Sequence, residues 1–415
     1  MMQVRAYIVN EAGKALAAGC TITTRYSVVR RQGFDLSKGG EKTKAEVQIL
    51  DYKQQQHRIL PLVASAYCFF FTGRKVLHDL QAIERNLVAG VGEMVTKTEV
   101  ADLHASSSCL KSFCSGVTAD GIEDLRKACG GHGFLQASGL PELLGTYLQN
   151  PTVEGDNYML PQQTVRVLLK IPQAVMSGDE EMMKAYEKCD SYYLVQKISK
   201  IMEGGDSQCS AIEKDTFLDL NVLLEAFKHR TARMLIATAE CMQENISEKG
   251  MSQQEAWNEG LVQFARVSRA HAMYLVLHNV CVFLNEEAHL TLGSAEVAVL
   301  KDLAILFALW WMEKDLGDFL EDGYLSGEQS SWVRKLVLTM MSKIRPEAVA
   351  LVDAWDYSDF RLKSALGRFD GIVYPAIMES TSKDPLNATE PGPGYEHLKR
   401  LIVDDVGVSG TASRL

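Results

Sequence analysis

The sequence lacks the cysteine pairs and ligand clusters that mark disulfide-rich or metal-binding proteins. Its nine cysteines are an odd number, and the two nearest in sequence, Cys109 and Cys114, do not have zinc-knuckle spacing. Scattered thiols of this kind predict a reduced compartment. The nine histidines are equally dispersed and form no HExxH pattern, so we expect no metal site.

An excess of basic charge and a long hydrophobic run are also missing. Lys and Arg number 43 against 53 Asp and Glu, which excludes the basic footprint of a nucleic-acid-binding protein. The apolar run Leu303–Met312 is too short to cross a bilayer, which takes about 20 residues, and Ile59–Phe71 is short and contains Pro61. Residues 1–6 show no signal-peptide core. We therefore expect a soluble protein with no membrane span.

Strand-like alternation is almost absent, whereas apolar residues recur at intervals of three and four, the period of a buried helix face. Gly13 and Gly19 disfavour the first helix, so we expect another backbone to approach them closely. Pro61 should kink or divide the second helix, and Ser106–Ser108 should interrupt the third. Ser294 is a candidate N-cap. The predicted helices cover 3–30, 45–80, 81–115, 116–127, 143–149, 158–169, 216–247, 252–287, 294–321, 328–343 and 346–354.

These patterns predict an all-α fold with two helical bundles in series. The first bundle covers residues 1–175 and the second covers 216–380. Residues 176–215 are less regular and more charged, and we assign them to a linker region. The segment 381–415 has few apolar residues and should form an extended, exposed tail.

One acid stands where chemistry could use it. Glu154 lies beside Gly155, just ahead of the apolar helix predicted at 158–169. A glutamate at a helix start is often a surface residue that favours the helix dipole. The alternative is a general base that removes a proton next to a thioester carbonyl, since burial among apolar neighbours raises the pKa of a glutamate toward the operating pH.

A glycine cluster and an arginine pair each allow two interpretations. Gly130-Gly131-His132-Gly133 is either a helix end and turn or a loop whose N–H groups approach a flat or anionic ligand. No βαβ unit surrounds it, which excludes a Rossmann fingerprint. Arg30 and Arg31 are either a solvated helix end or a phosphate clamp. The final residues Ser413-Arg414-Leu415 are similar to the Ser-Lys-Leu peroxisomal address, which predicts recognition by the peroxisomal import receptor.

Six segments together resemble one family, the acyl-CoA oxidases. They occur in the family's order along nearly the whole chain and read RYSVVRRQ (25–32), ACGGHGF (128–134), ASGLPE (137–142), VEGDN (153–157), LVDAWDYSD (351–359) and SALGRFDGIVYP (364–375). The resemblance implies an FAD enzyme of peroxisomal fatty-acid β-oxidation that converts acyl-CoA and O2 to trans-2-enoyl-CoA and H2O2. It also implies that residues 1–175 form a four-helix bundle like the C-terminal one of acyl-CoA dehydrogenases.

The resemblance also assigns roles to individual residues. Glu154 would take the α-proton of the acyl-CoA while the β-hydrogen leaves as hydride to FAD. The N–H of Glu154 and a flavin hydroxyl would polarise the thioester oxygen. Arg30 would reach the FAD of a partner subunit, and Gly130, Gly131 and Gly155 would belong to the cofactor-binding set. A homodimer with shared sites follows.

The sequence departs from the family in three places. Gln32-Gly33-Phe34 replaces the usual Gln-Phe-Gly, and Tyr158 stands where the family often has Thr. The family also carries an N-terminal helical domain and a middle β-domain before the helix at which this sequence starts. We therefore expect the base and the dimer side of the flavin site without a complete pocket, in a fragment, a truncated gene product or a short isoform. Two alternatives remain: an acyl-CoA dehydrogenase that uses an electron carrier, and a non-catalytic helical protein for dimerisation or interaction.

Overall fold

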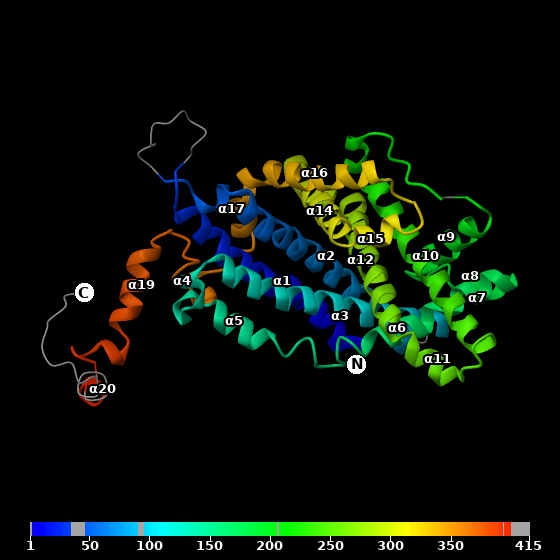
Figure 1. Cartoon of the computed structure of the whole chain (residues 1–415), viewed down its shortest axis with the longest axis horizontal. Coiled ribbons are helices and arrows are strands. Elements are labelled where there is room, and N and C mark those ends of the chain that lie inside the picture. The colour runs from blue at the N-terminus through cyan, green and yellow to red at the C-terminus, as the bar shows by residue number, and fades with distance from the viewer. Residues whose placement is uncertain (1, 35–45, 90–94, 206, 393, 400–415) are drawn as a thin grey trace, which may run out of the picture.

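The computed structural model describes residues 2–34, 46–89, 95–205, 207–392 and 394–399, and it consists of helices joined by short connections (Figure 1). Within these residues the only extended pairing is one antiparallel bridge between Arg31 and Gln48. The predicted all-α fold class is therefore confirmed.

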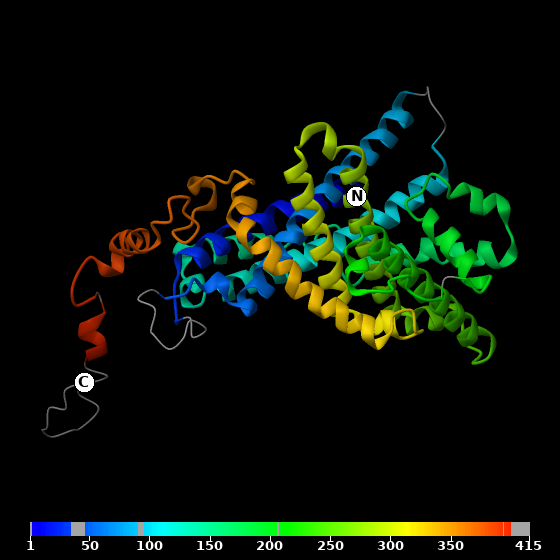
Figure 2. The same cartoon turned by 90° about the horizontal axis from the view of Figure 1, so that it is seen from above.

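The first half of the chain forms the elongated part of the molecule. Its helices are α1 (Met2–Val29), α2 (Lys53–Ala89), α3 (Lys97–Ala128), α4 (Gly131–Phe134), α5 (Leu140–Tyr147), α6 (Leu160–Leu168) and α7 (Lys170–Ser177). Helices α1, α2 and α3 lie side by side along the long axis (Figures 1 and 2).

The second half packs against α2 and α3. Its helices are α8 (Glu180–Ala185), α9 (Tyr192–Met202), α10 (Leu220–Ser247), α11 (Gln253–Glu259), α12 (Leu261–Glu286), α13 (Ala288–Thr291), α14 (Ser294–Lys314), α15 (Leu316–Leu320), α16 (Gly327–Ile344), α17 (Ala348–Asp353), α18 (Asp359–Leu362), α19 (Val373–Ser382) and α20 (Tyr395–Lys399). One hydrophobic cluster includes buried residues from α1 to α17, so the two halves share a core. Helices α19 and α20 extend away from it (Figure 2).

The contact between α1 and α2 depends on glycine. A Cβ on Gly13 would lie 2.6 Å from the backbone nitrogen of Phe70, and one on Gly73 would lie 2.3 Å from Cα of Asn10. Both distances are too short for real atoms, so the two backbones meet where side chains are absent. The expected close approach at Gly13 is confirmed. At Gly19 the nearest neighbours are side chains, led by Leu125 at 3.1 Å, rather than another backbone.

At Pro61 one of the two expected outcomes, division of the helix, does not occur, and two further local predictions were wrong. Helix α2 is not divided at Pro61, because proline removes only one bond of the helical ladder and the buried Leu60 and Leu62 on either side hold the helix in the core. Helix α3 continues through Ser106–Ser108, where Ser107 and Ser108 donate hydrogen bonds to the carbonyl of His104. Residues 97–115 therefore form one helix with 116–127, whereas residues 81–89 belong to α2.

A smaller error concerns the start of α14. Its N-cap is Gly293, and Ser294 is the first helical residue. Pro161, in contrast, lies in the first turn of α6, where proline fits without loss of a helical bond.

Two helices pass the length and composition test for a membrane span, residues Lys53–Asn86 of α2 and Leu261–Glu286 of α12. In the folded chain 72% and 78% of their most apolar windows are buried. Other helices of the core thus cover the apolar residues of both.

The segment assigned to a linker contains α9, which packs on the bundle through a buried acid. Asp102 of α3 accepts hydrogen bonds from the Ser191 hydroxyl at the N-cap of α9 and, at 2.9 Å, from the N–H of Asp190. Burial raises the pKa of Asp102 to about 7, and the nearby Asp190 carboxylate adds to the rise. The boundaries at 175 and 215 stay a prediction.

The glycine contact gives the first prediction. Gly73→Ala should lower the free energy of unfolding by about 1–3 kcal/mol, because its methyl group overlaps the backbone of α1. Gly145→Ala is the matched control, since a Cβ there meets nothing within 4 Å on exposed α5; it should stabilise the chain by about 0.5–1 kcal/mol. Urea unfolding measures both. Equal effects of the two variants would contradict the close contact.

The second prediction concerns pH. The folded chain holds a proton on Asp102 up to about pH 7, whereas the unfolded chain releases it near pH 4. Folded protein therefore binds more protons in this window, and Asp102 lowers the free energy of unfolding as pH rises through it. Asp102→Asn should flatten this decline in urea titrations between pH 4.5 and 7.5. Asp215→Asn, on an exposed side chain, should keep the original profile.

Candidate active site

The turn between α5 and α6 holds the predicted base in an unusual backbone conformation. Glu154 has φ of 58° and Gly155 has φ of 113°. A non-glycine residue in the left-handed region costs on the order of 1–3 kcal/mol and persists only where its surroundings hold it. Gly155 has no alternative, because a Cβ there would lie 2.6 Å from Cδ2 of Leu160.

Two buried cations donate hydrogen bonds to main-chain carbonyls of this turn. Arg5 of α1 donates from Nε to the carbonyl of Glu154 at 2.9 Å, and Lys111 of α3 donates from Nζ to the carbonyl of Gly155 at 2.7 Å. Lys111 also donates to Oδ1 of Asn157 at 3.0 Å. The interpretation of Glu154 as an acid among apolar partners was therefore incomplete. Both cations are distant in sequence, and only the packing of α1 and α3 brings them here.

Asn157 connects the same turn to α3. Its carbonyl accepts a hydrogen bond from the Ser112 hydroxyl at 2.8 Å, and its side chain bonds to Ser115 at 3.0 Å. The carboxylate of Glu154, unlike the side chain of Asn157, has an oxygen without a hydrogen-bond partner, because its Oε2 is buried and unpaired. Oε2 therefore has no hydrogen bond within the chain to lose when it accepts a proton.

Burial changes the acid–base behaviour of both cations. It lowers the pKa of Lys111 to about 8, against the opposing pull of the Asp156 and Glu154 carboxylates and with a contribution from Arg5. It also lowers the pKa of Arg5, which the Glu154 carboxylate partly offsets. Lys111 nevertheless remains mainly protonated at pH 7 and can donate to the turn.

The predicted cofactor residues form a second group, at the far end of α1. The guanidinium of Arg30 donates to the Tyr374 hydroxyl at 3.2 Å. The ring of His132 lies between two tyrosines, with Nδ1 bonded to the Tyr26 hydroxyl at 2.8 Å and its edge against Tyr374. Burial raises the pKa of Tyr26 to about 12, so its hydroxyl stays protonated.

The glycines of this group differ in what disfavours a side chain at each position. Gly130 has φ of 62° and ψ of −145°, a region that side chains rarely adopt. A Cβ on Gly130 or Gly131 would meet nothing within 4 Å, so this loop faces open space. Gly133, in contrast, is tightly packed, because a Cβ there would lie 2.0 Å from the carbonyl oxygen of Arg126.

The departures from the family pattern have local explanations. Gly33 has φ of 76° and lies against the Tyr52 hydroxyl, which donates to the carbonyl of Gln32 at 2.8 Å. The carbonyl of Arg30 accepts from the N–H of Ile49 at 3.0 Å, so the backbone around this arginine is fixed. Tyr158 is 86% exposed and therefore points away from the bundle.

The structure does not bring all the predicted residues together. Glu154 and Gly155 lie at the Arg5 end of α1, whereas Arg30, Gly130 and Gly131 lie at the other end. At a rise of about 1.5 Å per residue, the interval from Arg5 to Arg30 spans about 37 Å. Sequence order alone could not reveal this separation. The predicted targeting residues Ser413, Arg414 and Leu415 lie outside the described residues.

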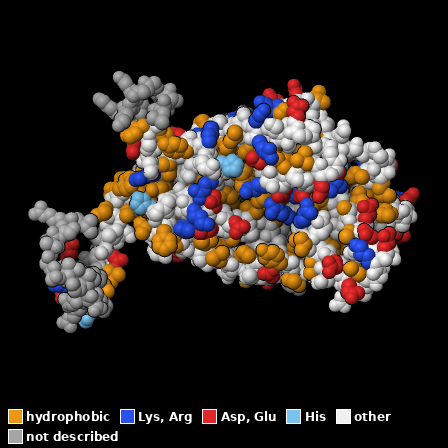
Figure 3. All heavy atoms as spheres, in the orientation of Figure 1, with side chains coloured by type: hydrophobic (Ala, Val, Ile, Leu, Met, Phe, Trp, Pro, Cys, Tyr) orange, Lys and Arg blue, Asp and Glu red, His pale blue; other side chains and the backbone are white. Residues whose placement is uncertain are grey.

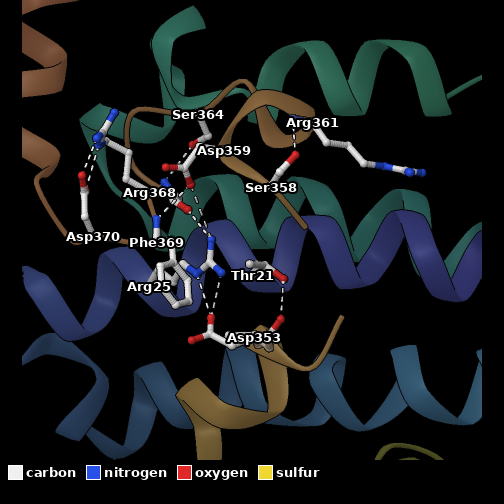
Figure 4. Close-up of polar contacts among 12 residues, drawn as sticks. Thr21, Arg25, Asp353, Ser358, Asp359, Arg361, Ser364, Arg368, Phe369 and Asp370 are labelled. Atoms are coloured by element: carbon white, nitrogen blue, oxygen red, sulfur yellow. Dashed lines mark hydrogen bonds and ion pairs between the residues drawn. The ribbon is translucent and has the colours of Figure 1, made fainter. Parts of the chain in front are cut away.

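A third buried cation, Arg25, was missed as an organising residue. Its guanidinium lies 2.8 Å from Oδ1 of Asp353, donates to the carbonyl of Gly367 at 2.7 Å and lies over the ring of Phe369 (Figure 4). Asp359 accepts from the N–H of Phe369 at 2.9 Å. These contacts attach residues 353–370 to α1. A charged residue on the buried face of a helix was the available signal.

Within the described residues no group of three or more His, Cys, Asp and Glu side chains is arranged to hold a metal ion.

Comparison with known proteins matches both halves of the chain. The family model "Acyl-CoA oxidase, C-alpha1 domain" matches residues 1–169 and the model "Acyl-CoA oxidase" matches residues 219–403. The chain is 38% identical to peroxisomal acyl-coenzyme A oxidase 1 of Rattus norvegicus over 405 residues, which are 97% of this chain and 58% of the rat protein. The chain therefore belongs to the acyl-CoA oxidase family.

Solved structures agree with this assignment. The Arabidopsis thaliana acyl-CoA oxidase 1 structure superimposes with a TM-score of 0.85 at 34% identity, covering 98% of this chain and 57% of that one. The Caenorhabditis elegans acyl-CoA oxidase-1 structure, complexed with FAD and ATP, gives 0.83 at 31% identity, covering 98% of this chain and 57% of that one. The chain therefore spans a little over half the length of the relatives it matches.

The Arg25 contacts give the third prediction. Arg25→Met should lower the free energy of unfolding by roughly 3 kcal/mol, because it strips the partly buried Asp353 of its partner and leaves the Gly367 carbonyl unpaired. Residues 354–372 should then become sensitive to trypsin. Lys363→Met removes an exposed ion pair to Glu142 and should change stability by less than about 1 kcal/mol. An Arg25→Met chain as stable and resistant as the original would refute the role.

Proposed function

We propose that this chain provides the catalytic base of a peroxisomal acyl-CoA oxidase, which converts acyl-CoA and O2 to trans-2-enoyl-CoA and H2O2. The observation that carries the proposal is the Glu154 carboxylate. Its Oε2 is buried and unpartnered, in a turn held by two cations. Such an oxygen can accept the α-proton of a thioester without first losing an internal hydrogen bond.

Residues at the other end of α1 fit a flavin. Gly130 and Gly131 leave room for close approach of a flat ligand, and Arg30 offers a guanidinium suited to phosphate oxygens. FAD, when bound, supplies the acceptor for the β-hydrogen and passes electrons to O2. The Caenorhabditis elegans relative is described in complex with FAD, which supports the same cofactor here.

The separation of the two groups supports a homodimer. In one chain, the Arg5 that holds the Glu154 turn lies about 37 Å along the helix from Arg30, so neither group alone makes a complete site. In a two-fold dimer, one chain would contribute Glu154 and Gly155 while the partner contributes Arg30, Gly130 and Gly131. Each dimer would then contain two shared sites.

A groove with a cavity volume of about 360 Å³ runs beside α1 and α5, and Leu143 belongs to its apolar lining. Its lysines do not form a free basic surface, because Lys14 is paired with Glu11 and Lys363 with Glu142, and all four residues line the groove. In the view of Figure 3, the basic side chains over the middle of the molecule likewise lie among acidic ones. The apolar part of the groove therefore fits a fatty acyl tail better than it fits phosphate groups.

Peroxisomal location is part of the proposal. The relatives are named peroxisomal enzymes, and the terminal Ser413-Arg414-Leu415 is similar to the import address. We further propose residues 1–175 and 216–380 as the two helical units, separated by 176–215. The two family models match segments of similar extent.

The covered length favours one alternative, a helical protein that dimerises or binds partners without catalysis. Expression of residues 1–415 with added FAD distinguishes the two functions. Yellow protein that forms H2O2 from palmitoyl-CoA in air supports the oxidase. Reduction of an artificial acceptor without H2O2 supports a dehydrogenase. Colourless protein that cannot take up FAD supports the non-catalytic function for the chain alone, and the assay is then repeated with the family's preceding domains attached.

The shared site gives the fourth prediction. Glu154→Gln and Arg30→Ala should each abolish or strongly reduce H2O2 formation, since one removes the base and the other a cofactor contact. A heterodimer of the two variants, purified through two different tags, should regain about half of the original activity, because one of its two sites has both residues intact. Glu154→Gln combined with itself should stay inactive. A silent heterodimer would contradict the shared arrangement.

A further inference from the structure

We propose that Lys111 is a positioning residue of the reaction, which holds the Glu154–Gly155 turn through its main chain and leaves the Glu154 carboxylate unpaired. The inference rests on the proposed function of Glu154 as the base.

The turn requires an external hold. Glu154 adopts a left-handed backbone conformation although it is not glycine. This conformation costs free energy that contacts within the turn itself do not offset. The following carbonyl, that of Gly155, points toward α3 and accepts the shortest hydrogen bond of the turn, 2.7 Å from Nζ of Lys111. A rigid base needs this because a misplacement of about 1 Å can cost on the order of 100-fold in rate.

Burial of the Lys111 ammonium costs more free energy than a purely structural contact requires. Its side chain is fully buried, and a buried ammonium loses hydration that only strong acceptors can replace. It donates to two uncharged oxygens, the carbonyl of Gly155 and Oδ1 of Asn157. Asn157 is in turn fixed by Ser112 and Ser115. The charge is thus concentrated on the backbone beside the base.

The placement of the cations separates two tasks. Arg5 and Lys111 hold successive carbonyls, those of Glu154 and Gly155. A direct ion pair on the carboxylate would weaken it as a base, because an opposite charge in contact favours the ionised form. Held through its backbone, Glu154 keeps a defined position while Oε2 stays without a hydrogen-bond partner. Lys111 thereby positions the base without competing for its proton.

Hydrogen–deuterium exchange of the whole 415-residue chain tests the hold without any cofactor. Lys111→Met keeps the length and removes the donor, so amides in peptide 151–160 should exchange at least about ten-fold faster. The matched control is Lys197→Met, which removes another buried ammonium, paired with Glu225 at 2.8 Å. It should leave peptide 151–160 unchanged. Unchanged exchange in Lys111→Met, or the same acceleration in Lys197→Met, would overturn the proposal.

A second variant covers the case in which Lys111→Met does not fold. Asn157→Ala removes one acceptor of the ammonium and should accelerate exchange in the same peptide by a smaller factor. Unchanged exchange in this variant would then count against the hold.

Kinetics connects the hold to the reaction. In the form of the enzyme that makes H2O2, Lys111→Met should lower kcat by on the order of ten-fold or more, with KM and FAD affinity unchanged. A change in KM alone would overturn the positioning role. If Glu154→Gln retains H2O2 formation, the proposed function fails, whereas the exchange experiment still decides whether Lys111 holds the turn.

Discussion

The structure depends on the backbone contact between α1 and α2. Gly13 and Gly73 let the two helices approach at distances that no side chain would permit, and this contact fixes the direction of α1 through the core. Two arginines of α1 and one that directly follows it then reach three different segments. Arg5 holds the Glu154 turn, Arg25 holds the segment 353–370, and Arg30 stands beside Tyr374. One helix therefore sets the positions of both candidate groups.

Buried cations bonded to main-chain carbonyls recur in this fold. Arg5, Arg25 and Lys111 each donate to a carbonyl of a loop that has no regular structure to satisfy it. An unpaired buried carbonyl costs about 1–3 kcal/mol, and a charged donor gives a stronger bond than a neutral one. The helical framework in this way fixes irregular segments between the helices, among them the turn that contains Glu154.

The chain carries two separate candidate groups within little more than half of the length of its relatives. Relatives at 38% and 34% identity share the fold over nearly the whole chain, and this chain covers little more than half of each. Within that half, Glu154 and the Gly130–Gly131 loop lie at opposite ends of α1. This separation is the observation that motivates the homodimer proposed above.

Much of the architecture could be predicted from sequence, because helix periodicity and glycine turns are local properties. The spacing of apolar residues determined α1 almost to its ends, and the order of short motifs determined the family. Local patterns failed where packing overrides propensity: Pro61 and Ser106–Ser108 remain helical because the core on both sides holds them. The sequence also singled out Glu154, Arg30 and the glycines of 130–131 without revealing their separation. Only tertiary structure decided that Arg5 and Lys111 grip the base and that α1 divides the site, since contacts between residues far apart in sequence leave no local pattern.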